Sequence, residues 1–220
     1  MLLSMNVIEL FSSIDGEGKR QGFLTTFLRL HDCNIRCSYC DTLYSYGPES
    51  TFESMSVQAV ADVIEQLENH RITVTGGEPL LQEPAIIELI DELTRRNARY
   101  DFNIETNGTI IPSFHRDNVW FTYDYKTPSS LAEDAVNLDI FKVATPADII
   151  KFVVGSMQDL DRMDEILKTY PTDAQIFVSP VWGNIEGATI IEYMKAHNWQ
   201  NVRFQLQIHK FIWDPDAKGV

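Results

Sequence analysis

The three cysteines of this chain lie in one short segment, C-N-I-R-C-S-Y-C at 33–40, and the chain has no others. Their spacing, C-x3-C-x2-C, lets a single loop wrap three sulfurs around one centre. A disulfide framework needs an even number of cysteines, whereas a structural zinc ion or an iron–sulfur cluster normally takes four protein ligands. Three thiolates from one loop therefore favour a cubic iron–sulfur cluster with one iron left open for chemistry.

Two other interpretations of the loop remain open from the spacing alone. His31 is placed to act as a fourth ligand and to give a Cys3His zinc site, although zinc ligands usually come from two separated pairs. The cysteines are also compatible with buried free thiols, which pack as small hydrophobic side chains. Other motifs in the chain are needed to distinguish these three interpretations.

The composition is ordinary for a globular protein, with 44% hydrophobic and 23% charged residues. A formal net charge of −14 argues against a non-specific nucleic-acid-binding face, which needs an excess of Lys and Arg. The start of the chain lacks the basic region and cleavage site of a secretory leader, and no apolar run is long enough to span a membrane. Clustered, reduced cysteines are typical of a cytoplasmic protein. We expect one domain over residues 1–220, cytoplasmic, with neither nucleic acid nor membrane as a partner.

Strand-like and helix-like patterns alternate along most of the chain. The segment 7–11 is a short apolar run. The predicted strands are the segments 25–30, 71–75, 102–104, 119–123, 149–154, 175–178 and 202–208. The predicted helices are 57–68 with Ser56 as its N-cap, one that opens at Pro84, 157–168 and 187–197. Region 44–53 is turn-rich, and 128–146 is irregular. This alternation predicts an α/β fold with a mainly parallel sheet and right-handed crossovers.

Three predicted strands end in polar or glycine-rich signatures. The cysteine loop follows 25–30, G-G-E-P follows 71–75, and E-T-N-G follows 102–104. Each of the last two is by itself an ordinary turn signal, as is D-G-E-G at 15–18. The carboxyl ends of neighbouring parallel strands, however, meet at one mouth. There Glu78 is suited to bind an amine, and Glu105 to accept hydrogen bonds from a pair of hydroxyls such as a ribose diol.

The C-x3-C-x2-C loop, followed one strand later by G-G-E-P, resembles the radical S-adenosylmethionine superfamily. The resemblance implies that Cys33, Cys37 and Cys40 hold a [4Fe–4S] cluster whose open iron binds S-adenosylmethionine. An electron from the cluster cleaves that cofactor to a 5′-deoxyadenosyl radical, which abstracts hydrogen, while the protein orients and shields the reaction. The core of such proteins is an incomplete barrel of the TIM type.

A finer resemblance, to the 7-carboxy-7-deazaguanine synthase family, covers nearly the whole chain. It rests on D-G-E-G, F-L-R-L before the cysteines, C-D-T after them, T-G-G-E-P, I-E-T-N-G-T and Q-L-Q-I-H-K-F near the end. It implies a lyase of queuosine and 7-deazapurine biosynthesis that converts 6-carboxy-5,6,7,8-tetrahydropterin into 7-carboxy-7-deazaguanine with loss of ammonia. S-adenosylmethionine is regenerated there, and Mg2+ is required. The family also suggests a homodimer that takes electrons from a donor such as a flavodoxin.

The family resemblance assigns roles to individual residues. The implied substrate-binding residues are Ile14, Asp15, Gly16, Glu17, Arg29, Thr75, Gln207, His209 and Pro215. The implied neighbours of S-adenosylmethionine are Tyr39, Cys40, Asp41, Gly77, Glu78, Glu105, Asn107, Lys126 and Ser179. Thr42 is implied as the Mg2+ ligand, and Arg29 as the partner of the substrate carboxylate. Simpler roles remain open for three of them: Arg29 as a strand-edge charge, Thr42 as a helix cap and Lys126 as a solvated surface group.

The chain departs from the family pattern at three places. Asp15 stands where the family often has Gln, and D-Y-K at 124–126 stands where S-P-K is common. Five residues follow Pro215, at which relatives can end with a carboxylate that reaches the substrate. We expect Asp214 or Asp216 to replace that carboxylate and residues 218–220 to be mobile and dispensable. A glycyl-radical activase and a metal-stabilised binding module are the alternative functions.

Overall fold

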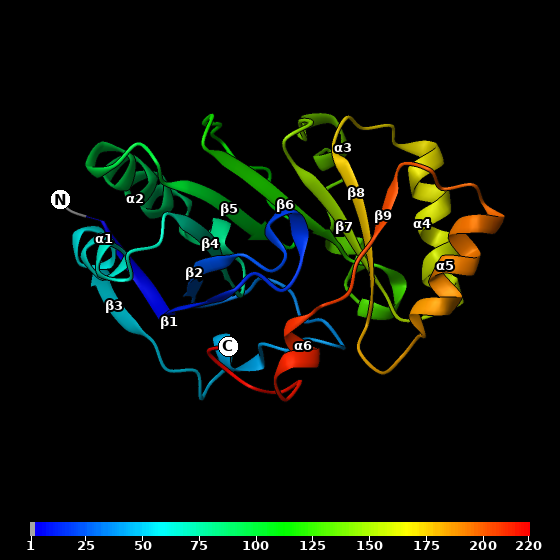
Figure 1. Cartoon of the computed structure of the whole chain (residues 1–220), viewed down its shortest axis with the longest axis horizontal. Coiled ribbons are helices and arrows are strands. Elements are labelled where there is room, and N and C mark those ends of the chain that lie inside the picture. Colours follow the sequence, from blue (N-terminus) through cyan, green and yellow to red (C-terminus); the bar gives the residue numbers. More distant parts are fainter. Residues whose placement is uncertain (1–2) are drawn as a thin grey trace.

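A computed structural model describes residues 3–220. Across these residues the strands form one sheet of nine, in the order β3-β1-β2-β4-β5-β6-β7-β8-β9 (Figure 1). The strands are β1 (Ser4–Ile14), β2 (Leu24–Leu30), β3 (Glu53–Ser56), β4 (Arg71–Gly76), β5 (Asp101–Thr106), β6 (Val119–Tyr125), β7 (Ile149–Val154), β8 (Gln175–Pro180) and β9 (Val202–Phe204). The α-helices are α1 (Val57–Gln66), α2 (Glu83–Arg96), α3 (Ile140–Val143), α4 (Met157–Thr169), α5 (Gly187–Ala196) and α6 (His209–Ile212).

The sheet is mainly parallel, as predicted. Each neighbouring pair from β2 to β9 is parallel, whereas β1 pairs antiparallel with both β2 and β3. The strand β3 was not predicted, because it is only four residues long, directly follows the turn-rich segment 44–53 and forms by pairing with the remote β1. The sheet stays open between β3 and β9, so the barrel is incomplete.

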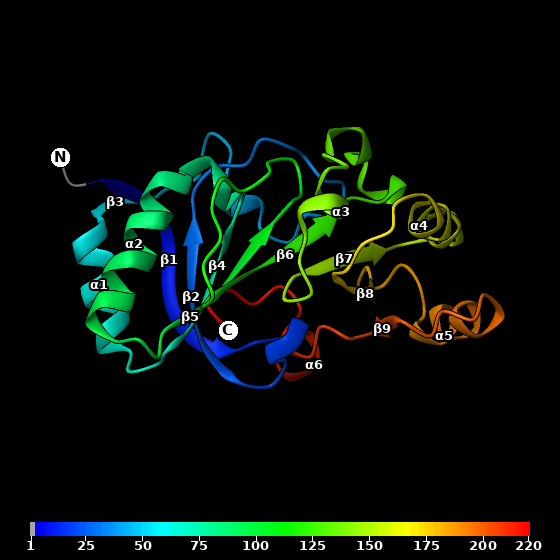
Figure 2. The same ribbon diagram turned by 90° about the horizontal axis from the view of Figure 1, so that it is seen from above.

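The helices begin where the local chemistry predicts. The Ser56 side chain accepts a hydrogen bond from the Ala59 N–H at 3.2 Å and caps α1. Pro84 lies in the first turn of α2, where its missing N–H costs no helical hydrogen bond. The pair α1 and α2 and the pair α4 and α5 flank the two ends of the sheet (Figures 1 and 2). Among residues 3–220, the helices are all too short or too polar to cross a membrane.

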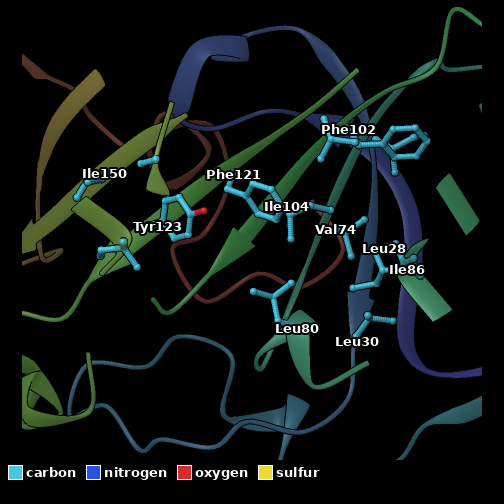
Figure 3. Packing of buried hydrophobic residues seen from close by; sticks show 14 of the residues in the cluster. Leu28, Leu30, Val74, Leu80, Ile86, Phe102, Ile104, Phe121, Tyr123 and Ile150 are labelled. Carbon is cyan, nitrogen blue, oxygen red and sulfur yellow. The ribbon is translucent and has the colours of Figure 1, made fainter. Parts of the chain in front are cut away.

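The strands alternate between apolar side chains on one face and polar ones on the other. In β6, Phe121 and Tyr123 join the hydrophobic core, whereas Thr122 and Asp124 line a cavity. Figure 3 shows Val74, Ile104, Phe121 and Tyr123 next to one another across neighbouring strands of the apolar face. Because side chains alternate along a strand, one face packs under the helices and the other is left for chemistry. We call these the outer and inner faces.

The segment 205–208 is not a strand, contrary to prediction. The backbone N–H of Gln205 still bonds to the carbonyl of Val178 at 3.0 Å, but the chain then leaves the sheet. The N–H of Ile208 reaches the carbonyl of Gly16 instead, also at 3.0 Å. Alternating polarity in L-Q-I-H resembles a strand, yet this segment finds its partners in a loop. The helix α6, which was not predicted, follows beside the hairpin of β1 and β2 (Figure 2).

Candidate active site

A cavity of about 270 Å³ lies on the inner face of the sheet. It is lined by inward residues of β1, β2 and β4 to β7, by the loop after β1, and by the cysteine loop with the turn that follows it. Residues just after β8 and the segment from 207 to the end complete the lining. Every predicted site residue lines this cavity except Glu78 and Ser179, which are fully buried outside it. The motifs that are scattered in sequence therefore share one chamber.

A row of polar side chains crosses the floor of the chamber on four neighbouring strands. Arg29 pairs in register with Thr75, and Glu105 pairs in register with Thr122. The Thr75 hydroxyl donates to Glu105 Oε2 at 3.1 Å and joins the two halves of the row. Because parallel strands keep this register, the row presents a guanidinium, hydroxyls and a carboxylate side by side.

Arg29 is held by an ion pair. Its Nε donates to Glu9 Oε1 at 2.6 Å, and the Tyr44 hydroxyl donates to the same oxygen at 2.7 Å. The strand β2 lies between β1 and β4, so Arg29 is not a strand-edge charge. Among the described residues, no side chain or carbonyl bonds to the two Nη atoms of Arg29. A fixed guanidinium with free Nη atoms is suited to bind a carboxylate.

Buried lysines and carboxylates alternate at the side of the chamber. Lys151 Nζ lies 2.7 Å from Glu17 Oε1 and 3.9 Å from Asp124 Oδ2, and Lys126 Nζ lies 2.9 Å from the same Asp124 oxygen. Burial opposes the charge on both lysines, but the neighbouring carboxylates more than offset it and raise the pKa of each. Lys126 is buried, so it is not a solvated surface group.

Sequence reasoning did not assign Lys151 to the site. The signal was a single lysine at an inward position of an otherwise apolar strand, I-I-K-F-V-V. Burying a charge there is costly unless it is paired, and the pairing with Glu17 became visible only in the fold. Other lining residues that sequence reasoning missed are Phe11, Phe27, Tyr44, Thr122 and Lys210.

Asp15 lines the chamber and is almost completely buried. Burial raises the pKa of Asp15 to about 7, with the charges of Glu105 and Glu17 adding to the effect. Its contact with the Thr73 hydroxyl is long, at 3.3 Å. Burial raises the pKa of Glu105 as well. Asp15 can therefore hold or release a proton near neutral pH.

The three cysteines line the same chamber. The backbone N–H of Ser38 bonds to the carbonyl of Ser130 at 2.9 Å and fixes the loop that carries them. Burial raises the pKa of the Cys33 and Cys37 thiols. His31 does not line the cavity, and its ring packs on Phe52 at 4.3 Å between centroids.

Across residues 3–220, no three His, Cys, Asp or Glu side chains converge closely enough to hold a single metal ion. A four-iron cluster does not require such convergence, because each thiolate binds a different iron at a different corner. Three half-buried thiols on one wall of a chamber suit a cluster better than a zinc ion, which needs all its ligands around one point. The residues present therefore fit the cluster.

The G-G-E-P turn supports the cysteine loop. A Cβ on Gly77 would overlap the backbone of Asp32, so only glycine permits this close approach. The Glu78 carboxylate accepts hydrogen bonds from the Leu80 N–H, the Thr106 hydroxyl and the Asn107 N–H, at 2.7–2.9 Å. Its oxygens are occupied by the protein itself, which makes it a brace between two strand ends. Glu78 is thus not free to bind an amine.

Thr42 lies on the wall of the chamber beside the cysteines. Its hydroxyl is 3.6 Å from Cys40 Sγ. It precedes the short turn of residues Leu43–Ser45, but its side chain makes no capping hydrogen bond there. The structure thus gives no support to the helix-cap role and leaves the hydroxyl available.

The tail after Pro215 lies against the chamber. Pro215, Asp216, Gly219 and Val220 all contribute to the lining, and Asp214 does not. The Lys218 ammonium sits 4.3 Å from the centre of the Tyr44 ring. Residues 218–220 therefore lie at the site, whereas the sequence led us to expect a mobile tail away from it. Whether activity needs them stays a prediction.

The chain matches known proteins along almost all of its length. Residues 29–169 match the radical SAM superfamily, whose members use S-adenosylmethionine and a [4Fe–4S] cluster. The 7-carboxy-7-deazaguanine synthase of Clostridium acetobutylicum is 36% identical over 223 residues, covering 99% of this chain and 100% of that protein. The enzyme of the same name from Methanospirillum hungatei is 36% identical, covering 96% of this chain and 86% of that protein.

A solved structure shows the same fold. The crystal structure of QueE from Escherichia coli superposes with a TM-score of 0.70 at 22% identity, covering 92% of this chain and 93% of that one. The open, mainly parallel sheet is thus the expected partial barrel. The extent and level of these matches place this chain in the 7-carboxy-7-deazaguanine synthase family of the radical SAM superfamily.

Proposed function

We propose that this chain converts 6-carboxy-5,6,7,8-tetrahydropterin into 7-carboxy-7-deazaguanine with release of ammonia, as a radical SAM lyase. One observation supports the proposal above all. Similarity to synthases of that name runs the full length of the chain, and the chamber on the inner face gathers three thiols, an arginine and several carboxylates. The glycyl-radical activase and the binding module gain no support from these relatives.

The cofactors fit the wall that carries the cysteines. Cys33, Cys37 and Cys40 are the residues that would hold the [4Fe–4S] cluster. When bound, the cluster and S-adenosylmethionine supply the radical that removes hydrogen from the substrate. The chamber residues proposed to surround S-adenosylmethionine are Tyr39, Asp41, Gly77, Glu105, Asn107 and Lys126. Glu78 and Ser179 act from behind this wall, because neither reaches the chamber.

Other residues of the chamber are proposed to bind the substrate. Arg29 is proposed to bind its carboxylate through the free Nη atoms, while Glu9 keeps the guanidinium in place. Glu17 and Asp15 supply acceptors for the amino and ring N–H groups of a pterin. Ile14, Gly16, Thr75, Gln207, His209 and Pro215 complete the proposed pocket. Asp15 is also placed to supply the proton that leaving ammonia requires, because it exchanges protons near neutral pH.

Mg2+ and two partners belong to the proposal as well. Thr42 offers Mg2+ an oxygen ligand that is bonded to nothing else but the nearby Cys40 sulfur. The radical step needs one electron, and we propose a reductant such as a flavodoxin as its source. We also propose a homodimer, on the family resemblance alone.

Turnover under anaerobic conditions tests the function directly. The protein is reconstituted with iron and sulfide, supplied with S-adenosylmethionine, Mg2+ and dithionite, and given 6-carboxy-5,6,7,8-tetrahydropterin. We expect equal amounts of ammonia and 7-carboxy-7-deazaguanine, identified by mass spectrometry, with no net loss of S-adenosylmethionine. Tetrahydropterin without the carboxylate is the matched control substrate. A cluster-loaded enzyme that cleaves S-adenosylmethionine but leaves the carboxylated substrate unchanged contradicts the proposal.

A further inference from the structure

We propose that Gln205 is a positioning residue, which closes the open side of the barrel and holds Glu17 in the substrate chamber. This inference rests on the proposed function, because it takes the chamber as the substrate site. Gln205 is buried at the end of β9, where its backbone N–H bonds to the carbonyl of Val178. Its side chain thus projects from a point that is anchored to the sheet.

The amide of Gln205 bonds with both of its polar atoms to the loop after β1. Its Oε1 accepts a hydrogen bond from the Gly18 N–H at 2.8 Å, and its Nε2 donates to Glu17 Oε2 at 3.4 Å. The two partners are 187 and 188 residues away in the chain. One side chain therefore satisfies a backbone donor of the loop and orients the carboxylate next to it.

Glu17 is held at both oxygens by different strands. Lys151 of β7 binds Oε1, and Gln205 beyond β9 binds Oε2. An ammonium on a flexible stem does not by itself fix the plane of a carboxylate, because its charge has little directional preference. A second donor on the other oxygen removes that rotational freedom. Gln205 thus decides which way Glu17 faces the substrate.

Further contacts draw the same two segments together. The Gln21 side-chain amide donates to the carbonyls of Gly16 at 3.1 Å and Leu206 at 2.6 Å. The N–H of Ile208 donates to the carbonyl of Gly16. A Cβ on Gly16 would overlap the ring of His209, so the glycine lets the imidazole pack on the loop backbone. These hydrogen bonds connect the two segments, as backbone pairing between strands would in a closed barrel.

Two variants of Gln205 separate its two hydrogen bonds. Gln205→Met keeps the length and burial of the side chain but removes both polar contacts. Gln205→Glu keeps an acceptor for the Gly18 N–H and replaces the donor to Glu17 with a repelling charge. Gln200→Met, at an exposed glutamine whose amide contacts only Asn198, is the matched control.

The test measures amide hydrogen exchange of residues 15–22, the substrate KM, and the affinity for S-adenosylmethionine in cluster-loaded protein. In Gln205→Met we expect exchange at Gly18 and the KM each to rise by about two- to tenfold, the range for one lost hydrogen bond. In Gln205→Glu we expect protection at Gly18 to remain while the KM still rises. Affinity for S-adenosylmethionine is expected to stay at the wild-type value in both, as in Gln200→Met.

A double-mutant cycle with Glu17→Gln shows whether Gln205 acts through Glu17. In the Glu17→Gln background, Gln205→Met is expected to add little to the KM. An unchanged KM in both Gln205 variants, or a full additional increase in the Glu17→Gln background, overturns the proposal. A wild-type enzyme without turnover contradicts the proposed function instead. In that case hydrogen exchange at Gly18 still tests whether Gln205 positions the loop. Unchanged exchange at Gly18 in Gln205→Met would overturn the positioning role.

Discussion

The two faces of the central sheet are built from the same strands but bury different kinds of side chain. The outer face carries Leu28, Val74, Ile104 and Tyr123, all fully buried under the helices. The inner face carries Arg29, Thr75, Glu105 and Asp124 in the same strands, one residue away in each case. Burial of apolar area stabilises the outer face. The inner face instead buries charges, which have to be paired to be tolerated at all.

The comparison shows how stability and chemistry share one sheet. A buried ion pair adds little net stability, because desolvation cancels most of the attraction between its charges. We therefore expect the inner face to contribute mainly to the reaction and little to the free energy of folding. The outer face is expected to contribute mainly to the free energy of folding. Substitutions on the two faces separate these contributions, and the effects below run from the largest to the smallest.

The largest effect is expected on the inner wall, at the cysteines. Cys33→Ala, Cys37→Ala and Cys40→Ala should each lose the cluster and lower turnover by on the order of 1,000-fold or more, since an open-iron cluster needs all three thiolates. Far-UV circular dichroism should stay at the wild-type spectrum. Ser38→Ala, in the same loop, is the control and should keep its iron. A cysteine variant with a full iron content and normal turnover would show that the loop is not the cluster site.

On the outer face, Phe102→Ala should lower the free energy of unfolding by about 3–5 kcal/mol, because it leaves a cavity under the helices. Phe102 is fully buried in the core and does not line the chamber. Urea unfolding measures the loss. The KM of the folded fraction should equal that of the wild type. A stable Phe102→Ala with an altered KM would break the division between the faces.

Asp15→Asn is expected to make the protein more stable at about pH 8 by on the order of 4 kcal/mol at most. The pKa of Asp15 is about 7 in the folded state and 3.8 in the unfolded state. Between these two pH values, Asp15 therefore binds a proton more strongly in the folded state than in the unfolded state. Wild-type stability thus falls as the pH rises through this window, and the cost is complete above it. Glu105 and Glu17 repel the Asp15 charge, and Arg20 attracts it.

Thermal unfolding of wild type and Asp15→Asn from about pH 4 to pH 8 checks this prediction. The difference between them should be smallest at the acid end, where Asp15 is neutral in the folded protein and only partly ionised in the unfolded chain. Asp117→Asn, at an exposed aspartate, is the control. Equal stabilities of wild type and Asp15→Asn at every pH would mean that Asp15 is charged in the folded protein at no cost.

Arg29→Lys should weaken substrate binding by about 1.5–3 kcal/mol, because an ammonium cannot reproduce the planar fork that binds a carboxylate. Calorimetric titration of cluster-loaded protein with substrate measures the change. The tetrahydropterin without its carboxylate should bind wild type and variant equally. If both ligands lose the same affinity, Arg29 serves the ion pair with Glu9 and not the substrate.

The smallest effect is expected for Thr42→Val, which removes a single neutral ligand of Mg2+. The concentration of Mg2+ needed for half-maximal turnover should rise by about two- to tenfold, the effect of one lost polar contact. Thr189→Val, at an exposed threonine of α5 that is not in the chamber lining, is the control. An unchanged Mg2+ titration in Thr42→Val assigns the metal to other ligands.

Much of the fold was predictable because its signals are local. The strands at 25–30, 119–123 and 149–154 and the helix that begins after Ser56 follow from apolar periodicity and capping, which depend only on neighbouring residues. The position of three motifs at one mouth follows from the parallel sheet. The strand β3 was missed, and the extension of the last strand over 205–208 was wrong, because the backbone partners of both segments are remote in sequence.

The sequence by itself determined the three-thiol loop, the alternation of strands and helices, and the gathering of the motifs at the strand ends. The spacing of residues along the chain carries all of this information. Only the tertiary structure decided that Lys151 pairs with Glu17, 134 residues away, that Glu78 is buried outside the chamber as a brace, and that Gln205 bonds to the loop after β1. A buried polar group takes whichever partner the packed chain brings within hydrogen-bonding distance, and no local pattern records that partner.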